Sequence, residues 1–230
     1  MTTLADQTTQ STAPLIVYVD VKSPYAFVAL KPTLALERRL SVNFDWRPLT
    51  LDIPSYLGSA RKDNRGRVVE NRRSSSQWSA VKYAYHDARR YAQRQGLTLR
   101  GTQKIWDSSI ANMGISWTVE RQRAQLPDYL NAVYPPFWRR ELNIEDISVV
   151  GGVLTSAGID ASGFEDYCAG DGRRKHDDLQ RRLHPAGIYG VPTYVVTDCG
   201  TILFGREHLP YVEWLLRGAQ GPAPDVAYTL

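Results

Sequence analysis

The chain has 230 residues, of which 43% are hydrophobic and 23% are charged, as in ordinary globular proteins. This composition excludes disordered, collagen-like and coiled-coil proteins. No apolar run approaches the roughly 20 residues that a transmembrane helix needs, so we expect no membrane partner. The net charge of +4 comes from arginine pairs interleaved with acids rather than from one basic stripe, so we expect no nucleic-acid partner.

The cysteines and the N-terminus limit which redox sites and targeting signals the sequence can contain. Cys168 and Cys199 do not form a CxxC motif, so neither a dithiol redox site nor a thiolate metal site is predicted. No two histidines have a credible ligand spacing, and we expect no metal. Residues 1–14 are polar and lack the charged and apolar regions of a signal peptide. We predict a disordered tail there and a cytoplasmic protein.

A βαβ unit opens the ordered part of the chain. Residues 15–20 are a β-branched apolar run typical of a buried strand. Ser23 is a favoured N-cap and Pro24 a favoured first helical residue, so a helix is predicted to begin there. Pro32 lies inside the helical pattern and should kink it. Residues 42–47 alternate apolar and polar, which predicts a second strand parallel to the first.

The middle of the chain has a different character. Residues 50–76 are polar with few periodic apolar positions, and we interpret them as a long surface excursion. Apolar residues at helical spacing, with glycines as stops, then predict several helices. These cover residues 78–96, 106–117, 127–142, 148–157, 160–170 and 171–186. Pro135 and Pro136 should break the third of them. Residues 55–187 are therefore expected to form an all-helical insertion.

The β pattern returns near the C-terminus. Residues 191–197 and 201–204 flank a turn and predict a hairpin, residues 208–217 predict a helix, and residues 218–230 predict a tail. The order βαβ, helical block, ββα is that of a thioredoxin-like α/β fold interrupted by a helical domain, as in the bacterial oxidoreductase DsbA. We predict a thioredoxin-like domain built from residues 15–54 and 188–217.

Four motifs in this order resemble one enzyme family. Ser23-Pro24 follows the first strand, where disulfide oxidoreductases carry CxxC. The helix over residues 78–92, the Gly-Val-Pro-Thr segment 190–193 and the turn 204–209 follow in sequence. Together they resemble the 2-hydroxychromene-2-carboxylate isomerases and kappa-class glutathione transferases, over residues 15–217. The resemblance implies a cis Val191–Pro192 peptide bond and glutathione as the cofactor.

The resemblance also implies roles for particular residues. Ser23 would be the catalytic residue, because its hydroxyl would hold the glutathione sulfur as a thiolate. Lowering a thiol pKa by about two units needs about 2.7 kcal/mol, which a charged hydrogen bond and a helix N-terminus together supply. The implied glutathione-binding residues are Pro24, Val191, Pro192, Gly205, Arg206 and Glu207. The implied substrate-binding residues are Lys22, Lys82 and Tyr83.

Plainer interpretations stand beside these. Ser23 caps a helix whatever else it does, and Lys22 could be solvated. Large aromatic residues such as Trp106 could line a substrate cleft or belong to the core, and His86 and His176 are expected at the surface. We therefore expect a glutathione-dependent isomerase, with a homodimer as one option for its assembly. A kappa-type transferase and a redox-inactive thioredoxin-like peptide-binding protein remain the alternatives.

Overall fold

A four-stranded sheet forms the centre of the computed structural model, which describes residues 6–225. Its strands are β1 (Leu15–Val19), β2 (Asp45–Pro48), β5 (Thr193–Val196) and β6 (Thr201–Phe204), in the order β2-β1-β5-β6. β1 is parallel to β2 and antiparallel to β5, which pairs in turn with β6. The predicted βαβ unit and C-terminal hairpin are confirmed.

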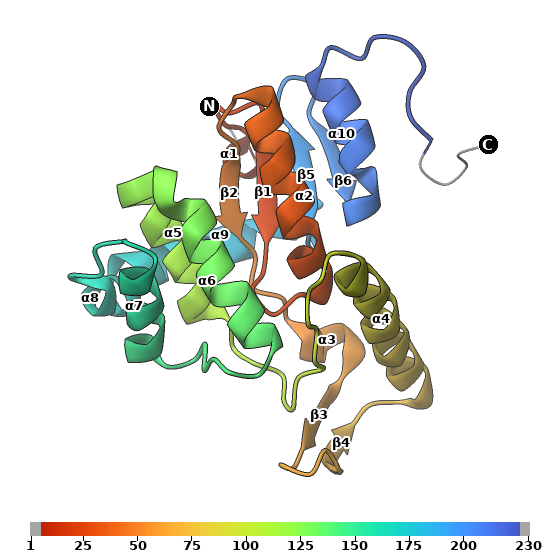
Figure 1. Cartoon of the computed structure of the whole chain (residues 1–230), viewed down its shortest axis with the longest axis vertical. Coiled ribbons are helices and arrows are strands. Elements are labelled where there is room, and N and C mark those ends of the chain that lie inside the picture. The colour runs from red at the N-terminus through yellow and green to blue at the C-terminus, as the bar shows by residue number, and fades with distance from the viewer. Residues whose placement is uncertain (1–5, 226–230) are drawn as a thin grey trace.

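Helices α2 (Pro24–Leu40) and α10 (Leu209–Leu216) lie along the sheet in the upper part of Figure 1. All five residues of β1 are buried, because the strand is covered on both faces. α2 contributes Phe27, which stacks on Tyr134 and Trp138 of the insertion. One hydrophobic core therefore joins the thioredoxin-like part to the insertion.

The insertion lies at the end of the sheet where β1 and β2 terminate and α2 begins. In Figure 1 its green and teal helices gather at the lower left and α4 stands at the lower right. Its helices are α3 (Ile53–Leu57), α4 (Ser75–Arg94), α5 (Ser109–Gln122), α6 (Leu126–Trp138), α7 (Ile147–Ser156), α8 (Phe164–Ala169) and α9 (Asp171–Leu183). Short 3-10 turns span Arg123–Gln125 and Arg206–His208. No helix of residues 6–225 is both long and apolar enough to cross a membrane.

The insertion is not all helical, so that part of the prediction is wrong. β3 (Ser59–Lys62) and β4 (Val68–Arg72) form an antiparallel hairpin that projects at the bottom of Figure 1. Every residue of β4 is exposed, and the sequence of β3, Ser-Ala-Arg-Lys, lacks the apolar alternation that marks a half-buried strand. Gly66, at φ 81°, closes the turn by donating its N–H to the carbonyl of Asp63.

The N-terminal prediction also needs correction. Residues 1–5 lie outside the described residues, but α1 (Asp6–Thr9) is helical and Thr8 is buried. The Tyr18 hydroxyl donates to the Thr8 carbonyl at 2.7 Å, and the Thr197 N–H donates to the carbonyl of Pro14 at 3.1 Å. Backbone contacts of this kind leave no apolar pattern in the sequence. Residues 218–225 of the predicted tail, by contrast, contain no helix or strand, and residues 226–230 lie outside the described residues.

The prolines do not interrupt their helices. α6 continues through Pro135 and Pro136, so the predicted break is wrong, and α2 continues through Pro32. The turn after Pro136 holds Phe137 and Trp138, which are almost completely buried. Burial of these two rings outweighs the hydrogen bonds that the prolines cannot donate.

Candidate functional site

A cavity of about 860 Å³ lies where the N-terminus of α2 meets the insertion. Its wall also includes the β2–α3 connection, α3, α4, the α4–α5 connection, the C-terminal end of α9 and the segment before β5. Most of the lining is aliphatic or aromatic, including Leu51, Tyr85, Trp106 and Ile188. A large apolar cavity with few polar groups is the usual form of a small-molecule site.

Ser23 lies in this cavity and caps α2. Its Oγ accepts the N–H of Ala26 at 3.2 Å and donates to the carbonyl of Val191 at 3.4 Å. Pro24 has no N–H, so the Tyr25 N–H is the helix-end donor left for a ligand. The long bond to Val191 holds the hydroxyl hydrogen weakly, so an anion at the helix end could receive it instead.

The Val191–Pro192 peptide bond is cis, as predicted, and it joins the helix end to the sheet. Val191 lines the cavity, and the Pro192 carbonyl accepts the Gly205 N–H at 2.9 Å. Gly190 lets the Phe204 ring lie against the backbone, since a Cβ would lie 2.5 Å from that ring and the ring would have to shift. Phe204 and Tyr189, with ring centroids 5.1 Å apart, form an exposed aromatic rim.

A buried carboxylate fixes the floor of the site. Asp20 is fully buried and accepts the Ser108 hydroxyl at 2.5 Å, the Leu51 N–H at 2.9 Å and the Asn112 amide at 3.1 Å. It also accepts the Lys22 N–H at 3.2 Å. These bonds tie the turn before Ser23 to the β2–α3 connection and to the start of α5.

Lys22 is a buried residue rather than a surface one. Its exposed fraction is only 6%, although it lines the cavity. The Lys22 charge attracts the Asp107 carboxylate electrostatically, but Asp107 is exposed and accepts the Ser109 N–H at 2.9 Å. Among the residues that the structure describes, Lys22 Nζ has neither an ion-pair partner nor a hydrogen-bond acceptor.

His176 lies beside this floor, so the prediction of a surface histidine is wrong. Its exposed fraction is 4%, and Nε2 lies 3.0 Å from the Thr50 hydroxyl. Burial, and then the charge of Arg173, lower its pKa to about 4, so the imidazole is neutral at physiological pH. Most residues of α9 are charged, so its sequence gives no sign that the position of His176 is buried.

The structure brings only part of the predicted site together. Four of the predicted residues line the cavity: Lys22, Ser23, Pro24 and Val191. Two others, Pro192 and Gly205, are not among the lining residues and are joined by a backbone hydrogen bond. Glu207 is exposed beside Gly205. Arg206 turns away, with its guanidinium carbon 3.2 Å from the centroid of the Tyr91 ring.

Lys82 and Tyr83 are exposed on α4 and do not line the cavity. Their neighbours Val81, Ala84 and Tyr85 line it instead. Val81 and Tyr85 belong to the apolar residues that recur at helical spacing in α4. This periodicity could have identified them as the face that turns toward the cavity.

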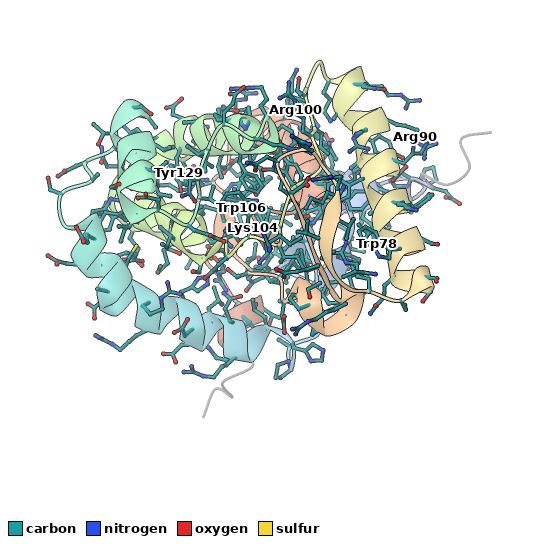
Figure 2. The ribbon with its side chains drawn as sticks, turned by 90° about the horizontal axis from the view of Figure 1, so that it is seen from below. Trp78, Arg90, Arg100, Lys104, Trp106 and Tyr129 are labelled. Atoms are coloured by element: carbon teal, nitrogen blue, oxygen red, sulfur yellow. The ribbon has the colours of Figure 1, made fainter. Side chains whose placement is uncertain are left out.

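Sequence reasoning missed several lining residues. Thr50 and Tyr56 come from the polar stretch that we had interpreted as a surface excursion. Trp106, for which the sequence left a cleft and the core as alternatives, does line the cavity. In Figure 2 it lies near the centre of the view beside Lys104, between the green helices and α4. Lys104 Nζ lies 4.4 Å from its ring centroid. Trp78 lies on α4 in the same view, and Arg73 covers its ring.

Both cysteines lie away from Ser23. Cys168 is buried in α8, and burial raises the pKa of its thiol to about 11. Cys199 is exposed in the turn between β5 and β6, and both are free thiols. The helix end at Ser23, Pro24, Tyr25 and Ala26 therefore carries no sulfur of its own.

Comparison with known families agrees with this architecture. The DSBA-like thioredoxin domain family matches residues 14–217. The chain belongs to that family. A comparison of the sequence with curated proteins found no match.

Solved structures of this DSBA-like fold include enzymes of two kinds. The chain is similar to a 2-hydroxychromene-2-carboxylate isomerase, with 21% identity and a TM-score of 0.63, over 90% of this chain and 94% of that one. It is also similar to the cytosolic disulfide reductase DsbM from Pseudomonas aeruginosa with GSH. That match has 16% identity and a TM-score of 0.59, over 89% of this chain and 98% of that one. At these identities the likeness establishes the fold.

Proposed function

We propose that this protein is a glutathione-dependent isomerase in which Ser23 stabilises the cofactor's thiolate. The observation that carries the proposal is the position of Ser23, at the N-terminus of α2, inside an apolar cavity and next to the cis-proline segment. Free N–H groups and the positive end of a helix favour an anion at this point. The absence of sulfur from the helix end favours a thiol that comes from outside the chain.

The residues present fit a γ-glutamyl thiol. The Ser23 hydroxyl and the Tyr25 N–H would receive the sulfur, and the backbone of Val191 would pair with the peptide part. The Glu207 carboxylate is exposed and makes no ion pair with any other described residue, so it can receive the ammonium of the γ-glutamyl group. Glycine is needed at 205, where φ is 117° and a Cβ would lie 2.5 Å from Glu207 Oε1.

When bound, glutathione supplies a thiolate that adds reversibly to a conjugated double bond, so that the bond can rotate before the thiolate leaves. The chain's own part is to bind and orient. Ser23 donates its hydroxyl hydrogen to the sulfur, and the apolar wall around Trp106 and Tyr85 excludes water and receives the planar substrate. Asp20 holds the loops that carry Ser23 and Leu51 in register.

The kappa-type transferase remains the alternative, because the same site would serve an irreversible addition. A cytoplasmic location belongs to the same proposal, since two free thiols suit a reducing compartment. The test is calorimetry with glutathione, followed by product analysis with a conjugated cis-enone. Binding with recovery of the trans isomer and unconsumed glutathione supports the isomerase. A stoichiometric adduct supports the transferase, and no binding of glutathione refutes both.

A further inference from the structure

Thr50 lies in the cavity wall, and side chains from two other elements fix its position. It is half-buried on the β2–α3 connection and lines the same cavity as Ser23. The Asn112 amide donates to Thr50 Oγ1 at 2.8 Å, and His176 Nε2 lies 3.0 Å from the same atom. Gln180 Oε1 accepts the Thr50 backbone N–H at 2.8 Å. Three side chains from α5 and α9 therefore hold this one residue in place.

The direction of the Asn112 hydrogen bond follows from its other partners. Asn112 Oδ1 accepts the Val21 N–H at 3.2 Å, and its Nδ2 donates to Asp20 Oδ1 at 3.1 Å. An amide whose oxygen faces a backbone N–H presents its NH₂ to Thr50. Thr50 Oγ1 is therefore the acceptor in this bond, and its own hydrogen points elsewhere. Through Asp20, the same amide links Thr50 to the turn before Ser23.

The position of the hydrogen on the His176 ring decides where the Thr50 hydrogen goes. The ring is neutral at physiological pH, so it carries one hydrogen, on Nδ1 or on Nε2. Nδ1 is buried without a partner among the described residues, so a hydrogen there would be a buried donor without an acceptor. Buried donors of that kind are rarer than under-satisfied acceptors. The network therefore assigns the hydrogen to Nε2, which donates to Thr50 Oγ1.

The Thr50 hydroxyl is then a donor that faces the cavity. Its oxygen has two lone pairs, and Asn112 and His176 use both of them. Its hydrogen has no acceptor among residues 6–225, and the cavity that Thr50 lines can supply one in a bound molecule. The two bonds that Oγ1 accepts also polarise the hydroxyl and strengthen its donation. A donor held rigidly in a largely apolar cavity is suited to stabilise an oxygen atom that becomes negative during a reaction.

We infer that Thr50 is a further catalytic residue, whose hydroxyl donates to the carbonyl oxygen of the acceptor substrate and stabilises the enolate that forms there. The inference rests on the proposed function for the thiolate that attacks. In that step a C–S bond forms at the β-carbon, the C=C π bond breaks, and its electron pair moves to the carbonyl oxygen. After rotation the pair returns, the C–S bond breaks and the thiolate leaves. The hydrogen stays on Thr50 throughout, so no proton is transferred.

The first test is the hydrogen position on the His176 ring, measured by long-range ¹⁵N–¹H correlation NMR of the wild-type protein at neutral pH. The inference requires the hydrogen on Nε2. A hydrogen on Nδ1 would make the Thr50 hydroxyl a donor to the ring rather than to the cavity, and would overturn the inference. This measurement needs no variant, so it decides even if a substitution at Thr50 prevents folding.

The second test uses 4-nitrophenol without glutathione, because its phenolate oxygen stands in for the enolate oxygen. Absorbance against pH at saturating protein gives the pKa of the bound phenol. Thr50→Val keeps the side-chain shape and removes the hydroxyl, so it should raise that pKa by about 1–2 units, the size of one hydrogen bond to a charged group. Thr50→Ser should keep the wild-type value.

Thr102→Val is the matched control. Thr102 is also half-buried in the cavity wall, but its hydroxyl pairs with that of Tyr85 at 3.1 Å. This variant should leave the pKa of the bound phenol unchanged. A wild type that does not bind 4-nitrophenol, or a bound-phenol pKa that is the same in the wild type and in Thr50→Val, would overturn the inference.

The phenol pKa also separates a catalytic threonine from a structural one. Thr50→Val deprives Asn112 and His176 of their acceptor, so its Tm should fall whatever the chemistry. A threonine that only supported the fold would lower the Tm on substitution without changing the pKa of the bound phenol. That combination would assign Thr50 to the fold and refute the inference.

Turnover of a neutral conjugated cis-enone keeps this inference apart from the proposed function. Thr50→Val should bind glutathione and ionise its thiol as the wild type does, because Ser23 holds the sulfur. Its turnover should fall by about 10²–10³, the usual cost of one preorganised donor. Unchanged turnover would overturn the inference and leave the proposed function intact. A wild type that does not bind glutathione, but whose bound-phenol pKa rises in Thr50→Val, would refute the proposed function and leave the oxyanion donor standing.

Discussion

Replacing Ser23 by alanine removes two interactions whose sizes can be estimated separately. The first is the cap, in which Oγ accepts the Ala26 N–H at 3.2 Å, and its loss should cost about 1 kcal/mol of unfolding free energy. For a protein of this size that lowers the Tm by roughly 2–4 °C. The second is the hydroxyl donation to bound thiolate, worth about 1.5–3 kcal/mol. Its loss should raise the bound-thiol pKa by about 1–2 units.

The control is Ser74→Ala, because Ser74 caps α4 in the same way and does not line the cavity. Both variants should lose similar stability in thermal and denaturant unfolding. Only Ser23→Ala should raise the bound-thiol pKa and slow isomerisation, by about 10²–10³, the usual cost of one preorganised donor to a developing anion. If the two variants differ from the wild type only in Tm, Ser23 is a helix cap and the proposed chemistry is wrong.

Three further predictions follow from the buried polar groups. Asp20→Asn should lower the unfolding free energy by about 3 kcal/mol in urea titrations, because an amide NH₂ would face groups that donate to the carboxylate. A loss of less than half of that would show that this hydrogen-bond network contributes little to stability. Stability should fall by about 3 kcal/mol as the pH drops from 6.5 to about 4, because the unfolded His176 binds a proton in this window and the folded one does not. His176→Gln should flatten that part of the profile, while exposed His86→Gln should leave it unchanged, and equal profiles for all three would contradict the assignment. In the native protein a maleimide should modify Cys199 and spare Cys168, which is buried with a raised thiol pKa, and labelling of both at equal rates would refute this.

The sequence predicted the thioredoxin-like half well because its signals are local. A β-branched run, a Ser-Pro helix start and an alternating segment identify β1, α2 and β2, and each depends only on neighbouring residues. Ser23 and Val191 were assigned to the site by resemblance to the isomerase and transferase family, which rests on short motifs of neighbouring residues.

The rest depended on packing between distant segments. Lys22 lies in the turn after β1, which α5 contacts through Asn112, and His176 faces Thr50 because α9 packs against α5 and the β2–α3 connection. No sequence pattern around either residue predicts those contacts. The β3–β4 hairpin has exposed strands, and its backbone pairing is not coupled to apolar periodicity. Lys82 and Tyr83 were chosen by likeness to a family motif, although the apolar phase of α4 pointed to Val81 and Tyr85.

The most direct test of the account is the pH titration of glutathione thiolate absorbance with and without saturating wild-type protein. The helix end and the Ser23 hydroxyl should lower the thiol pKa by about two units, which leaves most of the bound thiol ionised at neutral pH. In Ser23→Ala, measured in parallel, most of that shift should be lost, so that the bound-thiol pKa rises back toward the free value. A bound-thiol curve that coincides with the free one, at protein concentrations where calorimetry shows full binding, would contradict the central claim.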